Sequence, residues 1–311
     1  MIPQITAKSI ASSMTEDGER IDTLQLRYPR MVHADFMTHR VFSRNASSSR
    51  AIPHTSLTVR DADIYVPKFR VNQPGMQPGG FLTAEKQAEA ELIWREMADF
   101  ILEKTRLLAA KDGLNIHKQW VNRPLEWFGY IEVVVTATNW SNFDALRDHT
   151  DAQDEIMHLA QAIKQARAEA QPKVLGEGEW HLPYVTEQDR ADVADLVNRR
   201  RFSDFAVTII DTLCSVDNMN GLFERVTPET ALLLAISTAR CCRVSYSKHD
   251  GKRPEIDTDL ELYLRLAGAE PLHASPLEHQ ARIAMMDEPD WVQGNFQGFA
   301  QFRKFVPNEC L

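Results

Sequence analysis

The stretch Thr38-His39-Arg40-Val41-Phe42-Ser43-Arg44-Asn45-Ala46-Ser47-Ser48-Ser49-Arg50 gathers hydroxyl, amide and guanidinium side chains in one short run. Hydroxyls and amides can surround a phosphate, and an arginine fork can bind two of its oxygens at once. The apolar side chains of Val41 and Phe42 interleave with the polar ones, which indicates a packed segment and not a disordered tail. The run predicts a binding site for a small anion.

The surroundings of this run are basic, although the whole chain carries a formal charge of −9. Between residues 27 and 50 a single acid, Asp35, stands among five arginines: Arg27, Arg30, Arg40, Arg44 and Arg50. A basic island in an acidic protein favours an anionic small molecule as ligand. The plainer interpretation is a solvated loop rich in serine and arginine.

Size and composition set wider bounds. With 311 residues, of which 43% are apolar, the chain can bury a full core. No apolar run approaches the length of a membrane span, and the N-terminus has no signal-peptide pattern. The four cysteines form no Cys-x-x-Cys pair, as expected for buried thiols in a reducing cytoplasm. Net negative charge argues against nucleic-acid binding.

Helical patterns dominate, with a modest number of strands. We expect strands at 21–28 and 280–286, and an ambiguous β-branched run at 130–138. Expected helices occupy 30–42, a span from Thr83 to about Ala110, a long stretch capped by Ser141, a charged helix from Thr186, a helix begun by Thr227-Pro228, 256–266 and 296–305. Strands and helices do not alternate regularly, so the predicted class is α+β.

The opening run resembles the signature of the flavin-dependent thymidylate synthases, which is Arg-His-Arg, seven residues, then Ser. Here it reads Thr38-His39-Arg40, seven residues, then Ser48. Further segments resemble other motifs of that family: 142–147 with 152–156, 239–246, 273–279 and 301–304. The last three normally precede the Arg-His-Arg motif, so the chain resembles a circularly permuted member, with residues 170–230 as an atypical insertion.

This resemblance implies one catalytic domain over residues 1–311, with a mixed or antiparallel sheet flanked by long helices. It implies FAD as cofactor, NADPH and methylenetetrahydrofolate as co-substrates, and a deoxynucleoside monophosphate as substrate. The family reaction carries a one-carbon unit to C5 of dUMP to make dTMP. A homotetramer or dimer in the cytoplasm (of the host, if the protein is viral) is the expected state, with no nucleic-acid or membrane partner and no metal.

The resemblance also implies roles for individual residues. Arg147 would be catalytic, because its charge stabilises negative charge that develops on the pyrimidine and makes C5 more nucleophilic. The plainer alternative is a surface arginine paired with Asp151. The substrate-binding set is Ser47, Ser48, Ser49, Arg50, Arg147, Gln301 and Arg303. The cofactor-binding set is Thr38, His39, Arg40, Asn45, Asn142, Ser245, Ser275, Glu278 and His279.

Several positions depart from the family pattern, and they touch nucleotide or flavin recognition. Thr38 replaces the first Arg of the motif, Ala46 a frequent Glu, and Trp120 an Arg that binds phosphate. Two alternatives follow: methylation of dCMP or hydroxymethylation of dUMP or dCMP, and a non-catalytic nucleotide-binding homologue. For His279, ordinary hydrogen bonding between loop and strand is the alternative role. A metal site at His273, Glu278 and His279 is discounted, because this spacing fits no helical zinc motif.

Overall fold

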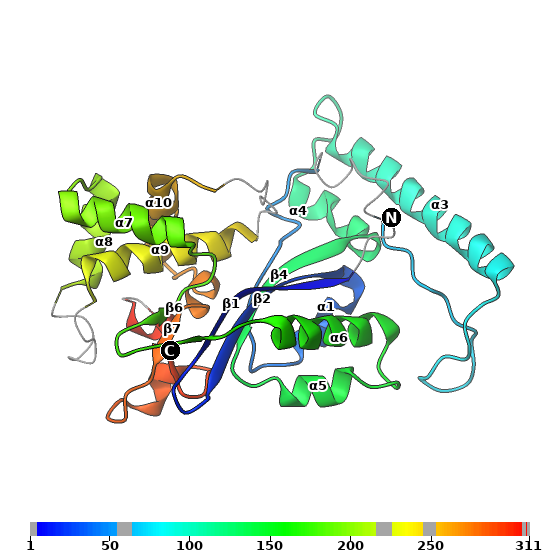
Figure 1. Ribbon diagram of the computed structural model, residues 1–311. Coiled ribbons are helices and arrows are strands. Elements are labelled where there is room, and N and C mark those ends of the chain that lie inside the picture. Colours follow the sequence, from blue (N-terminus) through cyan, green and yellow to red (C-terminus); the bar gives the residue numbers. More distant parts are fainter. Residues whose placement is uncertain (1–4, 55–63, 216–225, 245–252, 307–308, 310–311) are drawn as a thin grey trace.

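The computed structural model describes residues 5–54, 64–215, 226–244, 253–306 and Glu309 (Figure 1). The larger sheet of this described part has five strands, in the order β3 (Ser43–Ala46), β4 (Tyr130–Ala137), β2 (Arg20–Pro29), β1 (Thr6–Met14) and β5 (Lys173–Val174). Neighbouring strands are antiparallel except β1 and β5, which are parallel. The strand expected at 21–28 is confirmed, and the ambiguous run at 130–138 is the strand β4.

One face of this sheet is covered by α1 (His33–Met37), α5 (Ser141–Arg147) and α6 (Asp154–Glu169). Alternate side chains of β2 and β4, such as Leu24 and Val133, pack there against Phe143 and Leu159. Figure 1 shows α5 and α6 side by side across the strands. Because side chains of a strand alternate between faces, Thr23 and Thr136 lie on the other face of the sheet.

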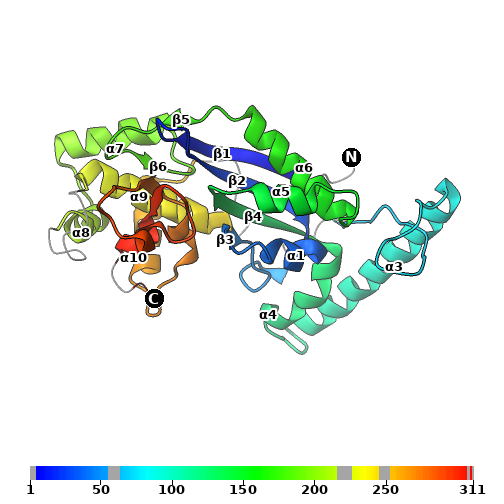
Figure 2. The same ribbon diagram turned by 90° about the horizontal axis from the view of Figure 1, so that it is seen from below.

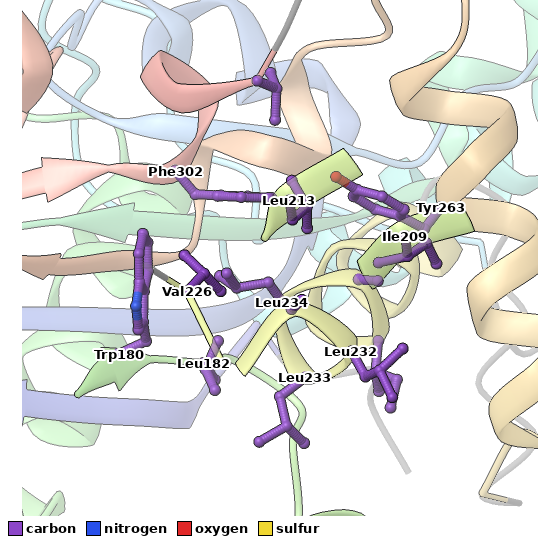
Figure 3. Close-up of a cluster of buried hydrophobic side chains, with 14 of the residues drawn as sticks. Trp180, Leu182, Ile209, Leu213, Val226, Leu232, Leu233, Leu234, Tyr263 and Phe302 are labelled. Atoms are coloured by element: carbon purple, nitrogen blue, oxygen red, sulfur yellow. The ribbon is translucent and has the colours of Figure 1, made fainter. Parts of the chain in front are cut away.

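The second layer contains a smaller antiparallel sheet and a group of helices. The sheet strands are β6 (Trp180–His181), β7 (Ala281–Ile283) and β8 (Phe299–Gln301). The helices are α7 (Glu187–Arg199), α8 (Asp204–Leu213), α9 (Pro228–Arg243) and α10 (Ile256–Ala267), with the 3-10 turns η5 (Ser275–Glu278), η6 (Asp290–Gln293) and η7 (Phe302–Phe305). Figure 3 shows their shared core, in which Leu234, Tyr263 and Phe302 are buried.

A buried charge cluster ties three of these helices together. Arg240 of α9 donates to Asp189 of α7 at 2.6 Å and to Asp259 of α10 at 2.9 Å. Both carboxylates are fully buried, and Arg243 and Arg253 complete the cluster. Burial alone would raise the pKa of Asp189, but hydrogen bonds from Arg240, Thr186 and Arg253 outweigh it and lower that pKa.

The long helix α3 (Ala84–Ala109) projects from the side of the molecule, next to α4 (Lys118–Val121) and the turn η3 (Arg123–Phe128) (Figure 2). Thr83 caps α3, as expected, by accepting from the N–H of Lys86. Thr186 and Thr227 likewise cap α7 and α9. Within the described residues, no helix is both long and apolar enough to cross a membrane.

Three expectations about local structure were wrong. The helix expected at 30–42 ends at Met37, after the turn η1 (Arg30–Val32) and the five residues of α1. The Thr38 hydroxyl bonds back to the carbonyl of Asp35, and the chain then turns to form β3. The run at 296–305 is a strand followed by a 3-10 turn. Its phenylalanines 299, 302 and 305 are all buried. Their spacing of three residues is also the spacing of apolar residues on one face of a helix, which is why the sequence pattern predicted a helix.

The third concerns Ser141, which was expected to cap one long helix. The structure has two helices, α5 and α6, separated by residues 148–153, all of which are polar except Ala152. Ser141 is the first residue of α5, and its N–H donates to the side chain of Asn139. The strand expected at 280–286 is also shorter, since β7 ends at Ile283. The α+β class itself is confirmed.

Candidate functional site

The edge strand β3 lies at the centre of the candidate site. One edge pairs with β4, and the turn η5 from far along the sequence packs against β3. Asn45 of β3 accepts from the Ser275 hydroxyl at 3.1 Å and donates to the carbonyl of Cys241 at 2.8 Å. Two predicted cofactor-binding residues, 230 positions apart, are thereby in direct contact. The oxygen and the nitrogen of the Asn45 side chain are therefore both engaged in hydrogen bonds within the chain.

A second cluster surrounds the amide of Gln301. Its Nε2 donates to the Ser43 hydroxyl (3.0 Å), to Asn295 Oδ1 (3.0 Å) and to the Glu278 carbonyl (3.1 Å). Arg303 pairs with the Glu278 carboxylate, and burial raises the pKa of that carboxyl. Gln301 is itself buried, so it links segments within the chain. Nothing in the sequence predicts Asn295 for this cluster, because the residue lies in none of the motifs.

The third cluster joins the motif to the end of α5. Arg147, the last residue of α5, donates from Nε to His39 Nε2 at 3.0 Å and from Nη2 to the Thr38 hydroxyl at 3.3 Å. Phe42 stacks on the His39 ring, and Phe143 meets it edge-on. Arg147 bonds to the motif here, whereas the plainer alternative paired it with Asp151.

The charge state of His39 follows from these contacts. Burial, and then the nearby cations Arg147 and Arg44, lower the pKa of His39. A neutral imidazole that accepts at Nε2 carries its proton on Nδ1. Thr38, Arg40 and Asn142 are exposed around this cluster.

The residues after β3 form a compact turn. Ser47 is engaged with β4, since its N–H donates to the carbonyl of Glu132 and its hydroxyl accepts from the Glu132 N–H. Ser48 is half-buried and Arg50 is exposed. The Ser49 hydroxyl is buried and has no hydrogen-bond partner within the described residues. The turn thus carries an exposed guanidinium on Arg50, and the residue before it has a buried hydroxyl with no partner among the described residues.

Three arginines of the basic island have structural contacts. Arg27 lies over the Tyr130 ring, Arg30 donates to the Ser47 carbonyl, and Arg44 donates to the carbonyls of Phe36 and Met37. Arg40 and Arg50, the other two members of the island, are exposed. Of the five arginines, Arg40 and Arg50 are therefore the most accessible to a ligand that arrives from solvent.

A buried row of hydroxyls and imidazoles lies on the inner face of the larger sheet. His181 contacts Ser13 (2.9 Å) and Thr23 (2.7 Å), Thr23 contacts Thr136 (2.6 Å), and Thr136 contacts His279 (2.8 Å). Burial lowers the pKa of each histidine to about 3. His279 is fully buried and its Nδ1 is hydrogen-bonded to Thr136 of β4, so a contact between loop and strand is present, while a role of His279 in cofactor binding stays a prediction. No motif in the sequence predicts this row of contacts, although the pattern of the chain predicts a strand at the position of Thr23.

A cavity of about 500 Å³ opens beside the start of α5. Its lining includes Arg20, Arg167, Asp144 and Trp140, and none of the predicted site residues. Arg167 pairs with Asp144 and lies over the Trp140 ring, so these charges are compensated.

The structure therefore brings half of the predicted residues into three contact groups: Thr38, His39 and Arg147; Asn45 and Ser275; and Gln301, Glu278 and Arg303. The turn 47–50 contacts β4 and the α4 region, and no hydrogen bond among the described residues joins it to Arg147. Ser245 lies outside the described residues. Contacts of all these residues with substrate or cofactor stay predictions.

Comparison with known proteins finds a family model that matches part of the chain. Residues 22–173, just under half of the chain, match the Thy1 family, described as thymidylate synthase complementing protein. This match confirms the resemblance inferred from the motif, and it includes that motif and α5. None of the curated proteins compared matches the chain.

Among solved structures, the UMP/dUMP methylase PolB from Streptomyces cacaoi, bound with 5-Br UMP, is similar to this chain at 17% identity and a TM-score of 0.43. The match covers 53% of this chain and 89% of that one. The flavin dependent thymidylate synthase ThyX from Helicobacter pylori, complexed with FAD and dUMP, is similar at 18% identity and a TM-score of 0.32, over 47% of this chain and 67% of that one.

Proposed function

We propose that this chain, whose residues 22–173 match the thymidylate synthase complementing protein family, transfers a one-carbon unit from methylenetetrahydrofolate to C5 of dUMP. The observation that carries the proposal is the contact of Arg147 with Thr38 and His39. It joins the predicted catalytic arginine to the motif that the family match contains. The printed names of the similar structures, a UMP/dUMP methylase and a thymidylate synthase, agree with the proposed substrate class.

In this proposal the turn 48–50 binds the nucleotide phosphate. The exposed guanidinium of Arg50 would donate two parallel hydrogen bonds, and the Ser49 hydroxyl would find its missing partner. Ser48 is then a substrate ligand and no nucleophile is required from the protein. The structure gives no direct hydrogen bond between this turn and Arg147, so a neighbouring copy of the chain is proposed to complete the site. The expected homo-oligomer, a tetramer or dimer, provides that copy.

Arg147 would face the pyrimidine ring. A guanidinium is always charged, so it stabilises negative charge on the ring oxygens as C5 attacks the one-carbon unit. The neutral imidazole of His39 accepts from Nε and fixes the direction of the guanidinium, which leaves other donors of Arg147 for the ligand. Because the aromatic rings of Phe42 and Phe143 hold the imidazole, this direction is set before any ligand arrives.

The residues around the contact between Arg147 and His39 fit a flavin. Thr38, Arg40 and Asn142 are exposed around this contact and offer a hydroxyl, a guanidinium and an amide. The polar groups of His39, Asn45 and Ser275 are engaged in contacts within the chain. These residues would therefore act indirectly, by keeping the cofactor-binding surface in shape. When bound and reduced by NADPH, FAD would supply the reducing equivalents that convert the transferred methylene to a methyl group.

The test uses the purified full chain. We expect a flavin absorption spectrum that NADPH bleaches, and tritium release from C5-labelled dUMP in the presence of methylenetetrahydrofolate. The mass of the product distinguishes a methyl from a hydroxymethyl group. Release from labelled dCMP and not from dUMP would replace the proposed substrate with dCMP. A colourless protein that binds no added FAD and releases no tritium would favour the non-catalytic homologue.

A further inference from the structure

A buried asparagine lies directly beneath the turn that follows β3. Asn122, at the end of α4, is fully buried, and its Nδ2 donates to the carbonyls of Ser49 (2.7 Å) and Ile52 (3.0 Å). Its Oδ1 contacts His54 Nδ1 at 2.8 Å. From the same helix, Lys118 Nζ donates to the carbonyl of Ala51 at 2.8 Å. Three residues of the turn, Ser49, Ala51 and Ile52, are thus held through their carbonyls.

The backbone N–H groups of the turn take no part in these contacts. The carbonyl of Ser48 accepts from the N–H groups of Ala51 and Ile52. Residues 48–50 lie in no strand or helix, and among the described residues their N–H groups donate to no backbone carbonyl. Successive N–H groups with no acceptor, beside a buried and unpaired Ser49 hydroxyl, are a typical arrangement for binding an anion.

An ordinary helix-capping role does not account for this asparagine. Asn122 is the C-cap of α4, but it caps through its backbone N–H, which donates to Lys118 and Trp120. Its side chain is left for the turn and for His54. A buried amide with both polar atoms satisfied by one loop fixes the shape of that loop, because each lost contact would leave a buried carbonyl unpaired.

We propose that Asn122 is a positioning residue that holds the turn 48–50 in the conformation that binds the nucleotide phosphate. The inference rests on the proposed function, since it takes the monophosphate as the ligand of that turn. Asn122 itself touches no substrate. Its effect passes through the backbone of Ser49 and Ile52, and His54 orients its amide.

The test measures, by calorimetry on the flavin-loaded full chain, the affinities for dUMP and for deoxyuridine, which lacks the phosphate. Asn122→Ala should weaken dUMP binding about tenfold or more and leave deoxyuridine binding unchanged, since only the phosphate meets the turn. In turnover, KM for dUMP should rise while kcat stays near the wild-type value. His54→Ala should shift dUMP affinity in the same direction by a smaller factor, and it tests the proposal if Asn122→Ala does not fold.

Val193→Ala provides the matched control. Val193 is fully buried in the core of α7 to α10, so its truncation lowers stability without touching the turn. Its affinities for both ligands should equal those of the wild type. Equal loss of dUMP and deoxyuridine binding in Asn122→Ala, or no loss of dUMP binding in the folded variants, would overturn the inference. Wild-type protein that binds no dUMP would instead refute the proposed function on which it rests.

Discussion

The guanidinium of Arg147 donates from Nε to Nε2 of His39 at 3.0 Å, across 108 positions of sequence. The cation therefore faces a neutral ring, which burial and the two neighbouring arginines keep unprotonated by lowering its pKa. A protonated His39 could not accept this bond, and two cations would then face each other. The pair orients Arg147 without neutralising it, which suits a group that must stabilise charge on a ligand.

Replacement of Arg147 by alanine should abolish most of the turnover. Loss of a preorganised charge that acts on the transition state reduces kcat about 100-fold or more. Flavin binding should persist, since the exposed side chains of Thr38, Arg40 and Asn142 remain. The measurement is tritium release from C5-labelled dUMP, with the visible spectrum as a check on bound flavin. Arg95→Ala, which removes an exposed pair with Glu91, is the control and should keep the wild-type rate. A normal rate in Arg147→Ala would refute the assignment.

Arg50→Ala should weaken the binding of dUMP. Charge-assisted hydrogen bonds to phosphate contribute about 1.5–3 kcal/mol, so the dissociation constant should rise roughly 10- to 100-fold. Because Arg50 is exposed, the free energy of unfolding should hardly change. Calorimetric titration with dUMP measures the affinity. Arg199→Ala, an exposed arginine paired with Asp195, serves as the comparison. If both variants bind dUMP equally well, Arg50 does not contact the phosphate.

Arg240→Met should destabilise the helical layer. The change leaves Asp189 and Asp259 buried, with Arg253 as the remaining cation beside Asp189 and Arg243 as the remaining cation beside Asp259. Breaking a buried ion pair costs about 3–5 kcal/mol, and the remaining arginines should keep the loss near 3 kcal/mol. Urea unfolding measures it, with Arg95→Met as a surface control. A loss below about 1 kcal/mol would show that the cluster adds little to stability.

Stability should fall in mild acid because of the buried histidines. His181 and His279 have a pKa of about 3 in the folded chain, against an ordinary value near 6.5. Between these values the unfolded chain binds more protons, so the free energy of unfolding decreases as pH falls from 6.5 toward 3. The slope is at most about 1.4 kcal/mol per pH unit for each histidine.

The difference between wild type and His181→Asn isolates this effect from that of the carboxylates. The variant loses hydrogen bonds and should be less stable at pH 7, but its free energy of unfolding should depend less steeply on pH between 5 and 6.5. Urea titrations at several pH values in this interval provide the comparison. Identical slopes for the two proteins would mean that His181 is not neutral in the folded state.

Local signals in the sequence predicted much of the secondary structure. Thr83, Thr186 and Thr227 cap the helices that follow them, because a hydroxyl at the N-cap satisfies an N–H wherever the helix lies in the fold. Spacing of apolar residues was less reliable. The three-residue interval of Phe299, Phe302 and Phe305 fits a helix as well as a strand followed by a 3-10 turn.

By itself, the sequence determined the α+β class, the basic motif and the resemblance of that motif to one family, because these depend on residue types and short spacings. Only the tertiary structure decided that Arg147 bonds to His39, that Ser275 meets Asn45, and that Asn122 holds the turn after β3. Each of these contacts joins segments that pack together through the burial of apolar surface. That burial is spread over many residues and has no short signature in the chain.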